Sequence, residues 1–165
     1  MSAVSSPSAV PALTPGALAG IVRRFAEQPG LWRPQVRFES PERYYVRLGR
    51  ATGHEVWLLT WLPGQGTDLH DHGGSAGAFH VFSGTLTEDT VATIAGTRPR
   101  VTSRELSAGA GRRFGTRHIH RIINRSTRPA ISIHVYGPAL TTMTRYRIGA
   151  ESLNVIAIEQ AGVQW

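Results

Sequence analysis

The sequence predicts an all-β domain, a two-sheet sandwich or barrel with a short helical cap at its N-terminal end. Beyond residue 43, short runs rich in β-branched and aromatic residues alternate with turn residues at intervals of roughly 8 to 12 residues. The chain also contains 18 glycines, a density that long helices would not tolerate. At 165 residues, 41% of them hydrophobic, it has enough material for one domain with its own core.

The N-terminal part divides into a leader and a cap. Residues 1–14 are rich in serine, alanine and proline, and we expect them to be a disordered leader. A helix is predicted from Pro15 to Gln28, because apolar residues recur there with a helical period and Pro29-Gly30 then ends it. We therefore expect one domain at residues 15–165, with the cap at about 15–43 and the barrel at about 44–150.

Strands are predicted wherever a β-rich run lies between turn residues. The expected strands cover residues 44–48, 55–61, 78–82, 85–93, 100–106, 111–114, 120–124, 131–135 and 143–148. Side chains two residues apart on such a strand share a face of the sheet. This period decides which polar residues can meet inside the barrel.

Composition narrows the classes of function. The formal net charge is +7, but the arginines that carry it are scattered and form no dense tract, so we do not expect nucleic-acid binding. No run of about 18 apolar residues is present, so no membrane span is predicted. The absence of cysteine excludes disulfides, thiolate ligands and a cysteine nucleophile, and it fits the cytoplasmic protein that we expect. We also expect a monomer.

The most informative motif is His70-x-His72, which lies in a frame of glycines. Because the two side chains share a face of an extended segment, they can aim at one metal ion. A glycine lies six residues before His70, and in a later strand His120 is followed by Asn124 after three residues. This two-part pattern is typical of the cupin barrel, a small double-sheet jelly roll with an internal metal site. We expect His70, His72 and His120 to be the ligands, with His118 as the alternative to His120.

Gly77 occupies the position five residues after His72, where many metal-binding barrels of this type carry glutamate. The site would then consist of three neutral imidazoles, a ligand type suited to Zn, Cu, Fe and Ni. Without a carboxylate, the metal would keep its full charge. Such a site favours anionic ligands, above all a thiolate, whose deprotonation the metal promotes.

Four segments give the chain its family resemblance. They are His70-Asp-His-Gly-Gly-Ser, Gly84-Thr-Leu-Thr-Glu, His120-Arg-Ile-Ile-Asn and Ala130-Ile-Ser-Ile-His-Val-Tyr-Gly-Pro. In these segments the chain resembles the cysteine dioxygenase family of thiol dioxygenases, over residues of about 44–146. The resemblance implies that His70, His72 and His120 hold Fe(II). It also implies a relay of Ser132, His134 and Tyr136 beside the metal, and these three alternate along one strand. Mammalian members cross-link a cysteine to the tyrosine, which Gly77 at the matching position makes impossible here.

The resemblance also implies a substrate-binding arginine. In the family it belongs to a Tyr-x-Arg segment, which Tyr45-Val-Arg47 matches, although the spacing to His70 is shorter by a few residues. An arginine fork suits a carboxylate, whereas related enzymes for 3-mercaptopropionate carry glutamine. Arg47 therefore favours oxidation of L-cysteine by O2 to cysteine sulfinic acid. Candidates for the pocket wall are Trp61, Phe79, Met143 and Tyr146.

Two sets of alternatives remain open from the sequence. The thiol could instead be 3-mercaptopropionate, cysteamine or a thio-imidazole amino acid such as ergothioneine. The chain could also be a cupin metalloenzyme of a different reaction class that uses another metal. Metal content and thiol-dependent O2 uptake distinguish these possibilities.

Overall fold

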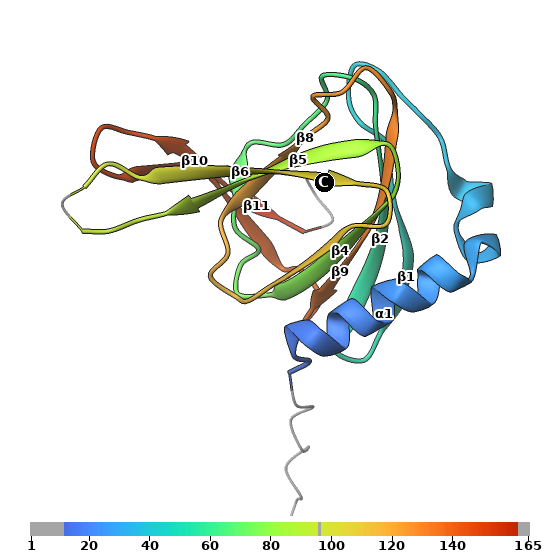
Figure 1. Ribbon diagram of the computed structural model, residues 1–165. Coiled ribbons are helices and arrows are strands. Elements are labelled where there is room, and N and C mark those ends of the chain that lie inside the picture. The colour runs from blue at the N-terminus through green and yellow to red at the C-terminus, as the bar shows by residue number, and fades with distance from the viewer. Residues whose placement is uncertain (1–11, 96, 162–165) are drawn as a thin grey trace, which may run out of the picture.

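Two antiparallel sheets face each other, and one helix covers the outer face of the first sheet (Figure 1). The structure is a computed structural model that describes residues 12–95 and 97–161. Most of the predicted leader, residues 1–11, lies outside the described residues. None of the helices in the described part of the chain is long or apolar enough to cross a membrane.

Helix α1 spans Pro15–Glu27, close to its predicted bounds. Thr14 caps its first turn by accepting a hydrogen bond from the backbone N–H of Ala17 at 3.2 Å. The apolar face buries residues three and four apart, Leu18, Ile21 and Val22, against the sheet. Two short 3-10 turns follow, at Pro29–Leu31 and Arg33–Gln35, and they lead the chain to the first strand.

The first sheet lies under the helix and contains five strands in the order β1-β2-β9-β4-β7. Their bounds are β1 Tyr45–Ala51, β2 His54–Trp61, β4 Ala76–Ser83, β7 Gly111–Phe114 and β9 Ala130–Gly137. On β9 the side chains alternate between two cores. Ile133 and Val135 pack toward α1, whereas Tyr136 packs between the sheets. This alternation turns the polar residues of β9 into the barrel.

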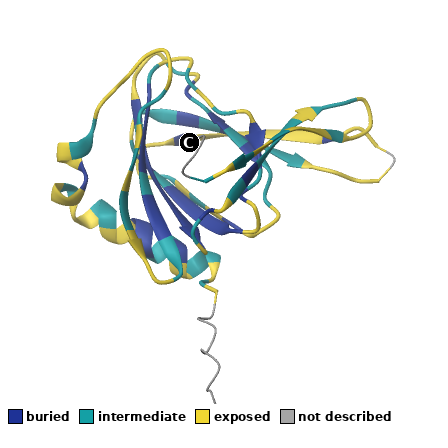
Figure 2. Cartoon of the chain, turned by 180° about the vertical axis from the view of Figure 1, so that it is seen from behind, coloured by how far each residue is buried: buried dark blue, intermediate teal, exposed yellow. Residues whose placement is uncertain are grey.

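The second sheet contains six strands in the order β11-β10-β3-β8-β5-β6. Their bounds are β3 Leu69–His70, β5 Thr85–Ala92, β6 Arg100–Ser107, β8 His120–Ile123, β10 Thr142–Ile148 and β11 Leu153–Gln160. Figure 2 shows buried residues concentrated where the two sheets and α1 meet, whereas the far ends of the long hairpins are exposed. The nine predicted strands are all present, and β3 and β11 are additional.

Candidate metal centre

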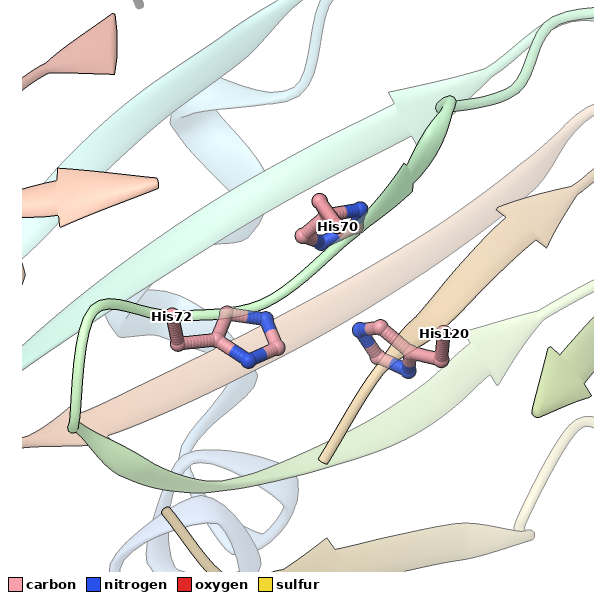
Figure 3. Close-up of side chains that lie close together, drawn as sticks. All are labelled: His70, His72 and His120. Carbon is pink, nitrogen blue, oxygen red and sulfur yellow. The ribbon is translucent and has the colours of Figure 1, made fainter. Parts of the chain in front are cut away.

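Three histidines point into the space between the sheets (Figure 3). His70 ends β3 and His120 begins β8, and the two are direct partners in the register of these strands. His72 follows His70 by two residues, so extended backbone turns it to the same side. All three side chains are buried, and one ring nitrogen from each lies within 4.8 Å of the others. The structure therefore brings together the three histidines that the sequence singled out.

Each of the three rings has at least one nitrogen without a hydrogen-bond partner among the described residues, and this nitrogen can bind a metal ion. Nδ1 of His70 lies 2.8 Å from the carbonyl oxygen of Asp68, which can only accept, so Nδ1 carries the proton. Nδ1 of His120 lies 2.8 Å from Oε1 of Glu88. In His72 both nitrogens are buried, and neither has a hydrogen-bond partner among the described residues. Because buried polar atoms are almost always hydrogen-bonded, the His72 ring fits a metal ligand better than a packing residue.

The surroundings keep these rings neutral. Burial, and after it the neighbouring histidines, lower the pKa of His70 and of His72 well below the ordinary value of 6.5. Burial also lowers the pKa of His120, although its hydrogen bond to Glu88 acts in the opposite direction. Only a neutral imidazole can offer a lone pair to a metal ion. The donor set therefore fits a transition metal that prefers imidazole ligands.

Glu88 on β5 is a fully buried carboxylate that supports His120. Its Oε1 also accepts a hydrogen bond from Nε2 of His118 at 3.0 Å, and its Oε2 accepts one from Nε of Arg112 at 2.7 Å. Burial alone would raise the pKa of Glu88, but these donors outweigh burial and hold the pKa well below its ordinary value. His118, the alternative ligand from the sequence, therefore braces the carboxylate that orients His120.

Glu88, His118 and His120 form a second group whose ligand atoms lie within 4.8 Å of one another. Hydrogen bonds already join Glu88 to both histidines. His72, by contrast, has no such partner among the residues described. The group of His70, His72 and His120 is therefore the better candidate for a metal site.

Phe114 on β7 explains why residue 77 has no side chain. A Cβ atom at Gly77 would lie 2.4 Å from Cζ of Phe114. The Phe114 ring itself is stacked between two histidine rings, with centroid distances of 4.9 Å to His72 and 4.7 Å to His118. An aromatic ring thus fills the space that a carboxylate or cysteine at position 77 would need. The three imidazoles receive no acidic partner from this position.

The β9 relay, Ser132, His134 and Tyr136, is a hydrogen-bonded row on the inner face of the strand. Oγ of Ser132 lies 2.9 Å from Nε2 of His134, and the Tyr136 hydroxyl lies 3.3 Å from Nδ1 of His134. The Phe79 ring stacks on His134 with a centroid distance of 4.9 Å, and the Trp61 indole N–H donates to Ser132 Oγ at 2.9 Å. Burial lowers the pKa of His134 to about 3 and raises the pKa of Tyr136 above its ordinary value. Imidazole and phenol are therefore both uncharged at neutral pH.

Two small cavities adjoin the relay and the histidines. The inner one, about 30 Å³, is lined by residues that include Arg43, His70, His120, His134, Tyr136 and Met143. The outer one, about 40 Å³, shares Arg43, Tyr136, Met143 and Arg145 with the inner one and adds Tyr45 and Trp57. Tyr45, predicted to contact the substrate, therefore lies at the outer cavity. Of the predicted wall residues, Trp61 and Met143 line the inner cavity, whereas the hydroxyl of Tyr146 donates to Asp71 instead.

Arg43 and Arg145 are the two cations that line both cavities, and they differ in their partners. Among the described residues, the buried Nε of Arg43 has no hydrogen-bond partner, and no carboxylate forms an ion pair with this side chain. Its guanidinium lies 5.2 Å from the centroid of the Trp61 ring. Arg145, the other arginine of the cavities, is already held by both carboxylate oxygens of Glu159, at 2.6 and 2.8 Å.

Arg47, which the Tyr-x-Arg segment predicted as the substrate-binding residue, lines neither cavity. Its side chain is 48% exposed, and its Nη1 lies 3.9 Å from Glu55. It lies over the Trp57 ring at 5.7 Å. Four residues earlier, Arg43 precedes the first residue of β1, so the chain can direct it inward independently of the strand period.

Two facing antiparallel sheets with an internal cluster of three histidines define a cupin-type metalloprotein. The model of the family described as cysteine dioxygenase type I matches residues 16–148. The chain belongs to this family, and it is a thiol dioxygenase whose substrates are O2 and a small-molecule thiol.

Similar solved structures agree in fold. A protein from Thermus thermophilus is 19% identical with a TM-score of 0.55, over 65% of this chain and 93% of that one. A double-stranded β-helix protein from Klebsiella pneumoniae is 20% identical with a TM-score of 0.58, over 73% of this chain and 88% of that one. An oxalate oxidase is 13% identical with a TM-score of 0.51, over 61% of this chain and 53% of that one. A search of curated proteins finds no match.

No role was assigned from the sequence to three residues of this centre: Arg43, Glu88 and Phe114. Glu88 could have been found from the sequence, because it lies two residues after Leu86 in a predicted strand and so shares the inward face with it. Phe114 carried a weaker signal, as a large apolar residue at the end of a short strand. Arg43 carried none, because it lies before the strand begins.

Proposed function

We propose that the chain is a non-haem Fe(II) thiol dioxygenase that adds both atoms of O2 to the sulfur of L-cysteine and forms cysteine sulfinic acid. We infer that His70, His72 and His120 hold the iron. The observation that carries this assignment is the buried His72 ring, whose two nitrogens have no partner among the described residues. When bound, Fe(II) would supply a Lewis acid that favours thiolate over thiol and a redox centre for O2. The sulfur provides the electrons, so no further reductant is needed.

Arg43 supports a substrate with a carboxylate. Its buried Nε has no partner among the described residues, so an anion that forms charge-assisted hydrogen bonds with the guanidinium would be stabilised there. Arg43 lines the inner cavity together with His70, His120 and Tyr136. A short substrate in this cavity could therefore contact Arg43 and the histidines at the same time. We therefore place the substrate carboxylate at Arg43 and not at Arg47, with Tyr45 at the wall of the outer cavity.

Substrate size follows from the same cavities. The two cavities are small, about 30 and 40 Å³, and this favours a small thiol over a bulkier thio-imidazole amino acid. Apolar side chains such as Leu59 and Met143 line both cavities and restrict water. The Tyr136 phenol, protonated at neutral pH because burial raises its pKa, can donate a hydrogen bond to an anion beside it.

Matched arginine variants test this proposal with an oxygen electrode and two thiols. Arg43→Gln should lower kcat/KM for L-cysteine about 10- to 100-fold, the effect of losing a charge-assisted hydrogen bond. The same variant should leave turnover of cysteamine, which has no carboxylate, nearly unchanged. Arg47→Gln is the control and should affect neither thiol. An equal loss with both thiols in Arg43→Gln, or a selective loss in Arg47→Gln, would contradict the assignment.

A panel with 3-mercaptopropionate and ergothioneine decides between the substrates. We expect L-cysteine to be oxidised fastest and ergothioneine slowest, because of the cavity size. A panel in which no thiol drives O2 uptake by the iron-loaded protein would overturn the proposed activity.

A further inference from the structure

The β9 relay also receives a hydrogen bond from a residue outside it, Trp61. The indole Nε1 can only donate, and it lies 2.9 Å from Ser132 Oγ in the fully buried core. Trp61 lies on the neighbouring strand β2, so the pairing of two rigid strands fixes this contact. One lone pair of the Ser132 oxygen is therefore taken.

Among its described hydrogen-bond neighbours, the Ser132 hydroxyl then has one acceptor to which it can donate. Within the described residues its two hydrogen-bond neighbours are Trp61 Nε1 and His134 Nε2. The indole cannot accept, so the proton must point to His134 Nε2 if it is to be satisfied. An unsatisfied buried hydroxyl is rare and costly. This requirement makes Nε2 of His134 an acceptor.

His134 must then carry its single proton on Nδ1. That nitrogen lies 3.3 Å from the Tyr136 hydroxyl, so Nδ1–H donates to the phenol oxygen. The stacked Phe79 ring keeps the imidazole in the plane that serves both bonds. The phenol proton has no partner in the relay and can turn to the inner cavity, which Tyr136 lines.

We propose that Trp61 is a positioning residue that sets this direction, so that Tyr136 presents its hydroxyl proton, and not a lone pair, to the inner cavity. With the relay reversed, the phenol would donate to His134 and turn a lone pair toward any anion in the cavity. A donor at this point stabilises a bound thiolate, whereas a lone pair repels it. The stabilisation of a thiolate by Tyr136 rests on the proposed function, but the direction of the hydrogen bonds rests on the relay geometry alone.

The position of the His134 proton is directly measurable. Long-range 1H–15N spectra of metal-free and Zn(II)-loaded protein show which ring nitrogen is protonated, and His134→Gln identifies the signal. We expect Nδ1–H in the unchanged protein. In Trp61→Phe, the ratio of the Nδ1–H form to the Nε2–H form should fall about tenfold, the effect of one hydrogen bond.

Trp32→Phe is the matched control. It also removes an indole N–H that donates a hydrogen bond, here to the Phe25 carbonyl at 3.0 Å, but in the helical cap. It should leave the His134 signal unchanged. Ser132→Ala removes the hydroxyl that donates to Nε2 and should lower the ratio as Trp61→Phe does, which tests the direction of the relay if Trp61→Phe does not fold.

Two results would overturn the inference. One is a proton on Nε2 of His134 in the unchanged protein. The other is a folded Trp61→Phe or Ser132→Ala variant with an unchanged ratio. If the proton lies on Nδ1 and responds as expected, but no thiol is oxidised, the proposed function fails and the assigned direction stands.

Discussion

Replacing Glu88 with glutamine should weaken metal binding by a predictable amount. Glu88 accepts hydrogen bonds from His120 at 2.8 Å, from His118 at 3.0 Å and from Arg112 at 2.7 Å. Glutamine has the same size, but one of its two terminal groups is a donor, so at least one of these donors would lose its acceptor. Leaving a buried donor unpaired costs about 1–3 kcal/mol. Loss of such support for a metal-binding histidine lowers metal affinity about 10- to 100-fold.

Competition with a chromophoric chelator measures this change for Fe(II) under anaerobic conditions and for Zn(II). Asp89→Asn is the matched control, because Asp89 is the next residue on β5, is equally buried and bonds to Ser103, Arg121 and Arg125 instead. Both variants should lose stability, but only Glu88→Gln should lose metal affinity. Unchanged affinity in Glu88→Gln, or an equal loss in Asp89→Asn, would refute the support of His120 by Glu88.

Three further changes test the centre and its surroundings. His72→Ala should fail to retain metal, and metal at the unchanged stoichiometry by elemental analysis would remove His72 from the ligand set. Gly77→Ala places a methyl group 2.4 Å from Phe114, and the overpacking should lower the free energy of unfolding in urea by about 1–3 kcal/mol; a variant of full stability would contradict that contact. The His134 pKa of about 3 lies below its ordinary value of 6.5, so between these values the unfolded chain binds a proton that the folded chain does not. The free energy of unfolding of the metal-free protein should therefore fall with falling pH in that window, by about 1.4 kcal/mol per unit for this group, and a slope that His134→Gln leaves unchanged would speak against it.

The fold was largely predictable because most strands bury one face. Alternation and turn residues marked nine strands, and the helical period marked α1. The two additional strands lack that signal. Strand β3 has two residues, too few to show a period, and it forms because it pairs with β10 on one side and, through His70 and His120, with β8 on the other. Strand β11 has apolar residues exposed on both faces and lies beyond the expected end of the barrel at residue 150.

The site was predictable where local spacing determines which side chains meet. His70 with His72, and Ser132 with His134 and Tyr136, each follow the period of two along an extended segment. The contacts that depend on tertiary packing were not predictable in this way. Arg43 reaches the cavities from outside a strand, Glu88 bonds to His120 from the neighbouring strand β5, and Phe114 meets the histidines across the barrel. A period along one strand carries no information on such partners.

The transfer of labelled oxygen tests the central claim most directly. Iron-loaded protein is supplied with L-cysteine under 18O2, and the product is analysed by mass spectrometry. A dioxygenase that acts on the sulfur should form cysteine sulfinic acid in which both sulfinate oxygens carry the label. A product with one labelled oxygen, a disulfide, or unchanged cysteine would contradict the account.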